Sequence, residues 1–226
     1  MVANDIYTLS SSNILPAIPL YALAGYILAE GGASRRLLRA LNAVVGWMPG
    51  GLAIALTCML AFFTTLGSGV TILSLGGLML PLLTKAKYPE KTSIGLVTVG
   101  GSTGLLFPPS LPVILYAIKA GIPIDELYIG GLIPGLLMVA VVAAWGAWQG
   151  WWRGAPRQVF HWREAASALW DAKLELMVPV LIIGGIFGGF ATLVEAAAIT
   201  VAYALVVECL VHRDLTVKRD IFRIAG

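Results

Sequence analysis

Two consecutive prolines, Pro108 and Pro109, interrupt a long apolar stretch and limit the possible fold more than any other feature of the chain. The apolar residues begin near Thr92 and continue past the prolines to about Ala120. A helix cannot run through this point, because neither proline has an N–H and each ring clashes with the carbonyl group one turn earlier. Each proline also drives the preceding residue away from helical angles, and nearby glycines allow conformations that a side chain would forbid. The sequence therefore predicts a broken helix over residues 92–120.

Inside a membrane, such a break has consequences for the backbone. The carbonyl groups from about Gly104 to Phe107 lose their helical partners, and hydrocarbon offers no donor, so they must line a protein-buried cavity or a polar site. Secondary transporters hold coupling ions and substrates at broken helices of this kind. The alternative is a packing kink whose serines bond back to their own helix. Two prolines, three flanking glycines and three hydroxyl groups favour a site.

Composition identifies the chain as an integral membrane protein. Of its 226 residues 58% are hydrophobic and only 12% are charged, about half the charged fraction of a typical soluble domain. The apolar runs exceed ten residues without alternation, so the predicted class is all-α and not a β-barrel. The net charge of +3 comes from residues in loops, which gives no indication of nucleic-acid binding. Cys58 and Cys209 lie in apolar runs, and we interpret both as small buried hydrophobic residues.

The first part of the chain predicts a membrane-associated unit followed by a hairpin. Residues 14–49 comprise a short apolar segment, a glycine pair and an arginine-rich stretch with the spacing of an amphipathic surface helix. Residues 50–83 form two apolar arms around Gly67-Ser68-Gly69. At 1.5 Å per residue each arm spans roughly 21–26 Å, less than the ~30 Å hydrocarbon core. We therefore expect a re-entrant hairpin, and the basic residues on both flanks predict that both ends lie in the cytoplasm.

The rest of the chain predicts membrane crossings in alternate directions. The loop from residue 150 to residue 173 is basic and flanked by tryptophans, which is typical of the cytoplasmic surface. Helical spacing from Trp162 to Trp170 predicts a surface helix within that loop. We treat residues 1–226 as a single partial transmembrane domain. Its predicted crossings are residues 92–120 outward, 127–148 inward, 174–190 outward and 194–211 inward.

Hydroxyl groups are the candidate ligands at the two glycine-rich breaks. Thr64, Thr65, Ser68, Thr71 and Ser74 surround the hairpin tip, and three more surround the Pro-Pro break. If the breaks face one another at similar depth, their hydroxyls and carbonyls offer oxygen atoms to a small cation. The alternative is that small residues only let helices pack closely. The predicted cation and substrate site comprises Thr65, Gly67, Ser68, Gly69, Thr71, Ser102, Thr103, Gly104, Phe107, Pro108, Pro109 and Ser110.

Other ionisable residues give weaker indications of a site. We interpret Glu195 as the one carboxylate well away from the charged loops, which makes it a functional candidate by default. It follows a glycine-rich turn, however, so a capping role at a helix N-terminus is favoured. His161 and His212 lie in polar loops without a second ligand at suitable spacing, so no metal site is predicted at these histidines, and no cofactor.

Taken together, these motifs carry a resemblance to a known family. The motifs occur in the same order as in the large membrane subunit of tripartite ATP-independent periplasmic (TRAP) transporters, within the broad ion-transporter superfamily, and the sequence resembles that subunit. The resemblance covers nearly the whole chain from about Ile14. The motifs that carry it are Ile18-Pro19-Leu20, Pro49-Gly50-Gly51-Leu52-Ala53, Ser68-Gly69, Gly104-Leu105-Leu106-Phe107-Pro108-Pro109-Ser110, Gly131-Leu132-Ile133-Pro134-Gly135 and residues 184–197.

This resemblance implies an elevator-type secondary transporter in the bacterial inner membrane. It implies that a sodium gradient drives uptake of a small organic acid, that a periplasmic binding protein delivers this substrate and that a small membrane subunit completes the complex. The hairpin tip and the Pro-Pro break are then one half of the sodium and substrate site. The chain departs from the family at the hairpin tip, Leu66 to Thr71, which has fewer serines than the family pattern.

Such transporters contain two inverted repeats, each with a hairpin and a broken helix, whereas this chain has one of each. It also lacks the family's opening helices. We therefore expect a partial chain that forms one half of an inverted-repeat transporter.

Two other classes of protein compete with a transporter. A membrane enzyme would need a nucleophile with a base, paired acids or metal ligands in the membrane, and none is convincingly placed, so we expect no enzymatic activity. A structural or assembly subunit, or an inactive transporter fragment, remains the alternative, with the Pro-Pro break as a simple kink.

Overall fold

The computed structural model describes residues 13–66, 69–212 and 214 of the chain. Within these residues the regular structure is helical and contains no strand, which confirms the predicted all-α class. The elements are α2 (Ala17–Glu30), α3 (Ala33–Val45), α4 (Gly51–Leu66), α5 (Gly69–Lys85), α6 (Glu90–Thr103), the 3₁₀ turn η1 (Gly104–Leu106), α7 (Leu111–Ala120), α8 (Ile124–Trp152), α9 (Trp162–Asp171), α10 (Lys173–Phe187), α11 (Leu193–Leu205) and the π-helical turn η2 (Val206–Val211).

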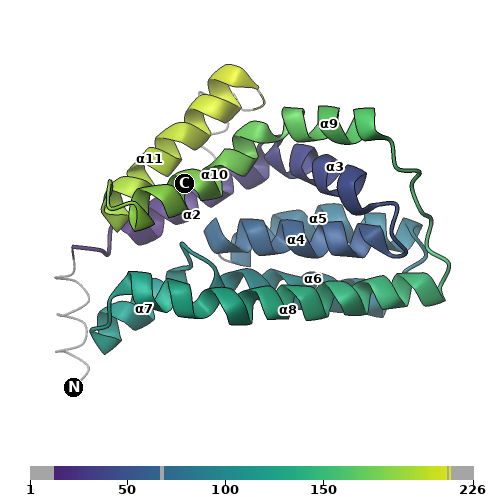
Figure 1. The fold of residues 1–226 in the computed structure, drawn as a ribbon, viewed down its shortest axis with the longest axis horizontal. Coiled ribbons are helices and arrows are strands. Elements are labelled where there is room, and N and C mark those ends of the chain that lie inside the picture. The colour runs from purple at the N-terminus through teal and green to yellow at the C-terminus, as the bar shows by residue number, and fades with distance from the viewer. Residues whose placement is uncertain (1–12, 67–68, 213, 215–226) are drawn as a thin grey trace.

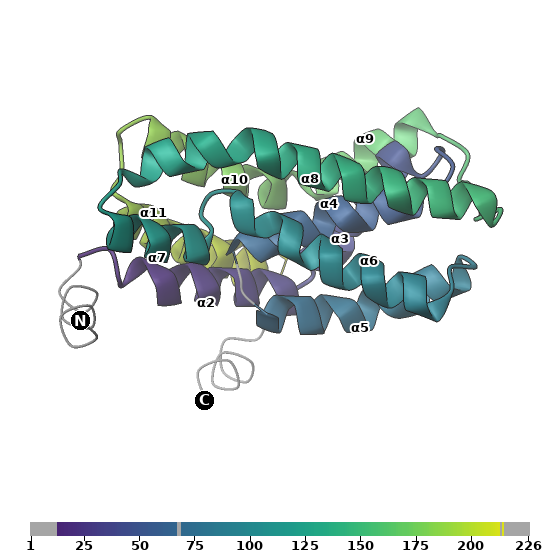
Figure 2. The ribbon, with the colours of Figure 1, turned by 90° about the horizontal axis from the view of Figure 1, so that it is seen from below.

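Helix α4 lies at the centre of the arrangement. Figure 1 shows α4 and α5 between α6–α8 on one side and the group of α2, α3 and α9–α11 on the other. α4 packs against α3, α5, α6 and α8, and α2 packs along α11. Seen from below, α6 and α7 follow one another alongside the long helix α8 (Figure 2). The arm that enters the predicted hairpin is therefore enclosed by other helices.

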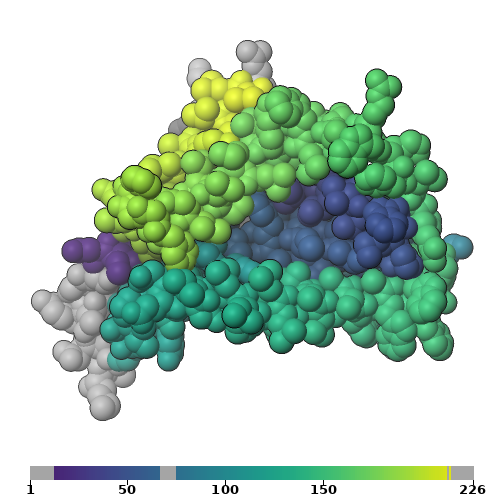
Figure 3. All heavy atoms as spheres, viewed as in Figure 1, coloured from purple at the N-terminus to yellow at the C-terminus, as the bar shows by residue number. Residues whose placement is uncertain are grey.

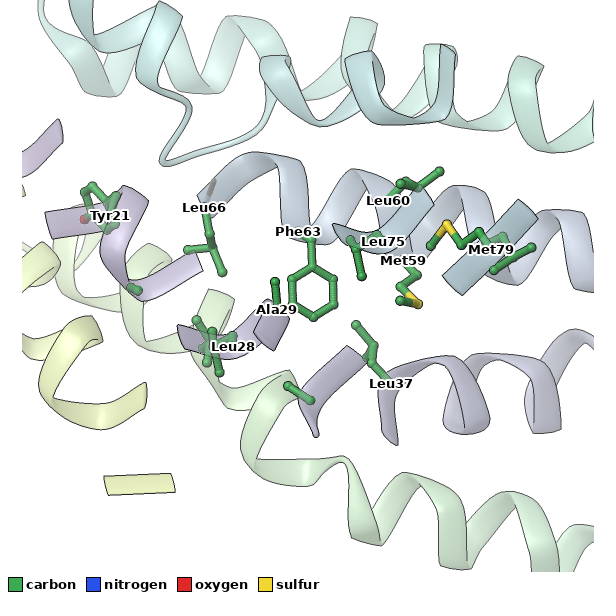
Figure 4. Close-up of a cluster of buried hydrophobic side chains, with 14 of the residues drawn as sticks. Tyr21, Leu28, Ala29, Leu37, Met59, Leu60, Phe63, Leu66, Leu75 and Met79 are labelled. Carbon is green, nitrogen blue, oxygen red and sulfur yellow. The ribbon is translucent and has the colours of Figure 1, made fainter. Parts of the chain in front are cut away.

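The core around α4 is made of large apolar side chains. Phe63 and Met59 of α4 point into a cluster that also contains Leu28 of α2 and Met79 of α5 (Figure 4), and each of these side chains is at most 1% exposed. Since lipid tails are as apolar as these residues, burial from water does not drive this association within a membrane. Close van der Waals packing between the helices holds the core together instead.

A few helices meet the requirements for crossing a membrane. By length and composition, α8 and the segment Leu193–Val211 are long and apolar enough among the described residues. The broken pair Glu90–Leu106 and Leu111–Ala120 would add a third span. α4 and α5 have 16 and 17 residues, in agreement with the short hairpin arms expected from the sequence. The re-entrant path, the crossing at residues 174–190 and the direction of each span stay predictions.

The predicted capping role of Glu195 is confirmed. Thr192 and Glu195 form a capping box at the start of α11, in which the Thr192 hydroxyl accepts from the Glu195 N–H at 3.3 Å. In return Glu195 Oε2 accepts from the Thr192 N–H at 2.7 Å. These two bonds satisfy donors that a helix N-terminus leaves without partners. Local structure therefore accounts for this carboxylate.

Candidate functional site

The broken helix is formed as the prolines require. α6 ends at Thr103, η1 adds one tighter turn, and Phe107 has extended backbone angles of −92° and 147° before α7 begins at Leu111. The peptide bond between Pro108 and Pro109 is cis. The two halves of the helix meet at an angle of 41°. The predicted interruption is therefore confirmed, and it changes the direction of the chain.

Two carbonyl groups at the break lack backbone donors. The Phe107 N–H donates to Gly104 O at 3.1 Å, and the Ser110 N–H donates to Phe107 O at 2.9 Å. We expected the carbonyl groups from Gly104 to Phe107 to lack donors. For Gly104 and Phe107 this is wrong, because N–H groups three residues later donate to them in tight turns. Among the described residues, no hydrogen bond reaches the carbonyl oxygens of Leu105 and Leu106. These two oxygens remain available as ligands.

Glycine at position 104 lets the break approach α4 closely. A Cβ atom on Gly104 would lie 2.8 Å from Thr64 Cβ and would also collide with the backbone carbonyl oxygen of Ala61. On the opposite side, Gly131 of α8 lies so near the break that its Cβ would be 2.8 Å from Leu106 O. Small residues thus hold the break between α4 and α8, beside the end of α4 that leads into the hairpin tip.

Most of the candidate hydroxyls bond back to their own helices. Thr64 donates to Leu60 O and Thr103 to Gly100 O, and both side chains are buried. The hydroxyls of Thr65 and Ser102 make the same kind of bond, to Phe62 O at 2.6 Å and Val99 O at 2.8 Å. This is the pattern expected of a packing kink. It is also compatible with cation binding, because a hydroxyl that donates its proton keeps its lone pairs.

Ser110 differs from the other hydroxyl residues. Its side chain is 0% exposed, and its Oγ has no hydrogen-bond partner among the described residues. The phenolic oxygen of Tyr128 on α8 is in the same situation. A buried hydroxyl without a partner costs free energy, and a bound ligand or a water molecule would satisfy it. Sequence reasoning included Ser110 but missed Tyr128, since nothing in the pattern around it marks its burial.

The hairpin tip is described only in part. The predicted ligands Gly67 and Ser68 lie outside the described residues, as does the side chain of Thr71. Gly69 is the first residue of α5. The structure therefore brings together Thr65, Phe107 and Pro108, while the contribution of the tip itself stays a prediction.

A hollow of about 260 Å³ opens beside the break. Thr65, Phe107 and Pro108 form part of its wall, and apolar side chains of α4, α8 and α10 form the rest. In the space-filling view, residues of α3 and α4 are visible in a recess between the α8 side and the α9–α10 side (Figure 3). Three of the candidate residues thus face a cavity that is mostly apolar, with few polar groups.

A buried cluster of charges was missed by the sequence reasoning. Arg36 of α3 donates from Nε to Glu175 Oε1 at 2.5 Å and from Nη2 to Glu208 Oε1 at 2.7 Å, and its Nη1 binds Asp214. The side chains of Glu175 and Glu208 are fully buried. The interpretation of Glu195 as the one remote carboxylate is therefore wrong. Glu208 within the apolar run 194–211 was the signal that could have revealed this cluster.

Arg36 acts as the shared partner of the cluster. Burial lowers the pKa of Arg36, but hydrogen bonds to Asp214 and Glu175 and the charges of Glu208 and Glu175 raise it above its ordinary value overall. The Gly32 N–H donates to Glu208 Oε2 at 3.1 Å, so both carboxylate oxygens of Glu208 have a hydrogen-bond donor. His212 Nε2 lies 3.7 Å from Glu175 Oε1. The cluster ties the amphipathic helix α3 to the ends of α10 and α11.

No metal-ligating group is found in the part of the chain that the structure describes, where no three His, Cys, Asp or Glu residues lie close enough to hold an ion. The oxygen ligands available at the break are carbonyls and hydroxyls, which suit a monovalent cation in a transporter.

A broken helix packed on a short hairpin arm, with free carbonyls beside small residues, is typical of the membrane subunits of secondary transporters. Comparison with known proteins agrees with this class. The family model of the tripartite ATP-independent periplasmic transporter, DctM component, matches residues 1–224. The chain belongs to this family.

Several curated relatives share most of this chain. The isethionate TRAP transporter permease protein DctMQ of Oleidesulfovibrio alaskensis is 38% identical over 222 residues, which cover 95% of this chain and 34% of that protein. The ectoine TRAP transporter large permease protein TeaC of Halomonas elongata is 36% identical, over 93% of this chain and 50% of the relative. The C4-dicarboxylate TRAP transporter large permease protein DctM of Vibrio cholerae is 32% identical, with coverage of 89% and 45%.

This chain thus spans between about a third and about half of the length of these relatives. The family match confirms the resemblance to the large membrane subunit of TRAP transporters, a family of inner-membrane transporter permeases and not of enzymes.

Proposed function

We propose that this chain forms part of the membrane subunit of a sodium-coupled secondary transporter that imports a small organic acid. The observation that carries the proposal is the chemistry at the break. The carbonyl oxygens of Leu105 and Leu106 lack hydrogen-bond donors among the described residues, and the Ser110 hydroxyl there is buried without a partner. Unwound carbonyl groups and neighbouring hydroxyls are the ligands that coordinate Na⁺ in transporters of this kind.

The names of the relatives support the substrate class. They refer to isethionate, ectoine and C4-dicarboxylates, which are small polar molecules that carry an acidic group. The segments that form the candidate site, residues 50–83 and 92–118, contain no Arg or Lys. We therefore propose that any cationic partner for the substrate's acidic group comes from another part of the transporter.

The proposed partners follow from the family. A periplasmic binding protein would deliver the substrate, and a small membrane subunit would complete the complex, as expected for a tripartite transporter. The proposal does not require the chain to transport alone, because the break and the hairpin arm supply one half of an inverted-repeat site.

A structural role is the second candidate function, and one observation favours it. The hydroxyls of Thr64, Thr65, Ser102 and Thr103 all bond back to their own helices, as they would in a kink without a ligand. In that case the chain would assist assembly and would bind no cation.

Uptake into proteoliposomes distinguishes the two functions. The chain is reconstituted with the products of its neighbouring genes, including any binding protein, and a panel of radiolabelled organic acids is supplied with and without a sodium gradient. Uptake that requires both sodium and the binding protein supports the proposal. Absence of uptake of every acid by a complex that is shown to be folded and assembled favours the structural role, and equal uptake without sodium contradicts sodium coupling.

A further inference from the structure

The last turns of α8 form an aromatic and basic hollow on the surface of the molecule. Trp148, Gln149, Trp152 and Arg153 line a space of about 420 Å³. The rings of Trp148 and Trp152 meet edge to face, with their centroids 5.9 Å apart. Arg153 follows the helix directly, and within the described residues no carboxylate pairs with its guanidinium. The hollow thus offers unpaired donors next to flat apolar rings.

A second hollow lies further along the same face of α8. It has a volume of about 310 Å³ and lies between α6 and α8, with Val141 and Trp145 on one wall and Gly95 and Val99 on the other. Its wall is almost entirely apolar. Residues 141, 145, 148 and 152 recur at intervals of four, three and four, so they form one stripe along the helix. The apolar hollow therefore leads toward the middle of α8, and the basic hollow lies at its end.

The order of these hollows matches the structure of a membrane lipid. Tryptophans lie at the level of the lipid headgroups, and α8 is long and apolar enough to cross a membrane. A guanidinium group binds phosphate through two parallel hydrogen bonds, and basic residues near the cytoplasmic surface attract anionic headgroups. An acyl chain requires an apolar groove of the kind found between α6 and α8.

We propose that this stripe of α8 is a binding site for an anionic phospholipid, whose phosphate lies against Arg153 and Gln149 and whose acyl chain lies in the groove between α6 and α8. The site lies on the outer face of α8, apart from the Pro-Pro break. This proposal does not depend on the proposed transport function, because lipid binding requires only the membrane and helices α6 and α8.

Native mass spectrometry of the full chain in detergent measures the binding directly. Phosphatidylglycerol and phosphatidylcholine with identical acyl chains are titrated separately. For Arg153→Gln we expect the affinity for phosphatidylglycerol to fall about fivefold and the preference over phosphatidylcholine to disappear. The matched control is Arg163→Gln on α9, which removes the same charge from another exposed position. An equal loss in the control would show that only overall charge matters and would overturn the site.

The acyl groove has a test of its own. A Cβ atom on Gly95 would meet nothing within 4 Å, so Gly95→Phe fills the groove without a clash against the backbone. We expect this variant to weaken both lipids about equally. Gly77→Phe on α5 is the control, since Gly77 also has open space at its Cβ. Unchanged binding by Gly95→Phe, with an unchanged unfolding temperature, would contradict the placement of the acyl chain.

A competition experiment separates a lipid from a soluble anion. Glycerol 3-phosphate offers a glycerol-linked phosphate, as a monoester, without the acyl chains. The proposal predicts that millimolar glycerol 3-phosphate leaves phosphatidylglycerol bound. Complete displacement would identify a phosphate site for soluble ligands and would overturn the assignment to a lipid.

Discussion

The replacement of Arg36 by alanine tests how the helices are held together. Arg36 is the positive partner of Glu175 and Glu208, whose side chains are fully buried. Removal of one partner from a buried ion pair costs about 3–5 kcal/mol, because it leaves uncompensated charge in a medium of low polarity. For a chain of this size ~1 kcal/mol lowers the unfolding temperature by about 2–4 °C. We therefore expect Arg36→Ala to lower the unfolding temperature by roughly 6–20 °C.

The same helix provides a matched control. Arg39 pairs with Asp171 at 3.2 Å, but the two side chains are 56% and 47% exposed. Exposed pairs contribute about 0–1 kcal/mol, so Arg39→Ala is expected to change the unfolding temperature by only a few degrees. The assay is thermal unfolding of purified protein in detergent, followed by circular dichroism. Equal shifts for the two variants would refute the reasoning, because they would show that burial of the carboxylates adds nothing to the effect.

A compensating variant tests the physical cause. Glu175→Gln and Glu208→Gln together remove the buried negative charges that Arg36 neutralises. On this background the further change Arg36→Met is expected to cost much less than it does in the unmodified chain. If the cost is unchanged, Arg36 contributes through packing of its side chain and not through charge.

Two further predictions concern the break, and a third concerns the loop that leads into α6. Gly104→Ala is expected to destabilise the protein by about 1–3 kcal/mol through its collision with α4, whereas Gly95→Ala in α6, the helix before the break, should be neutral or stabilising; unfolding temperatures compare them. Ser110→Ala is expected to leave the unfolding temperature unchanged or raise it, since a buried unpartnered hydroxyl is removed, yet to raise the sodium concentration needed for half-maximal uptake. Tyr88→Phe is expected to cost about 0.5–1.5 kcal/mol through its bond to Gly146 O.

The effect of Tyr88 depends on pH in a defined direction. Burial raises the pKa of Tyr88 from 10.0 to about 12, so the folded state favours the neutral phenol. The stabilisation by Tyr88 is complete below pH 10 and is lost as the pH rises from about 10 toward 12. The stability difference between the wild type and Tyr88→Phe should therefore shrink across that range in chemical unfolding curves. A constant difference from pH 8 to pH 11 would mean that the phenol is not buried.

The helices were predictable because their patterns are local. Apolar runs, glycine pairs and the two prolines mark the ends of α2, α4 and α6 in the sequence itself, and the capping box at Thr192 and Glu195 involves residues only three apart. α8 extends beyond the predicted residues 127–148 to Ile124 and Trp152. Its first turn contains Asp125 and Glu126, which the helix dipole favours, although their charge had suggested a loop.

The charge cluster could not be predicted from one sequence. Arg36 is 139 residues from Glu175 and 172 residues from Glu208 along the chain, and their pairing depends on how α3 packs against the ends of α10 and α11. The close approach of Gly104 to α4 also depends on how distant segments pack together, so one sequence does not reveal it. The sequence marked the oxygen-rich residues of the candidate site, but not which hydroxyls bond back to their helices and which one stays unpartnered.

The central claim is that the Pro-Pro break forms part of a sodium and substrate site, and sodium-driven uptake by the assembled transporter tests it most directly. The variant combines Pro108→Ala with Pro109→Ala, and the control is Pro134→Ala, which changes another proline inside a helix of the same domain. The account predicts that the double variant assembles but loses most sodium-dependent uptake, while the control retains it. Near-normal uptake by the double variant would contradict the account and leave the break as a kink.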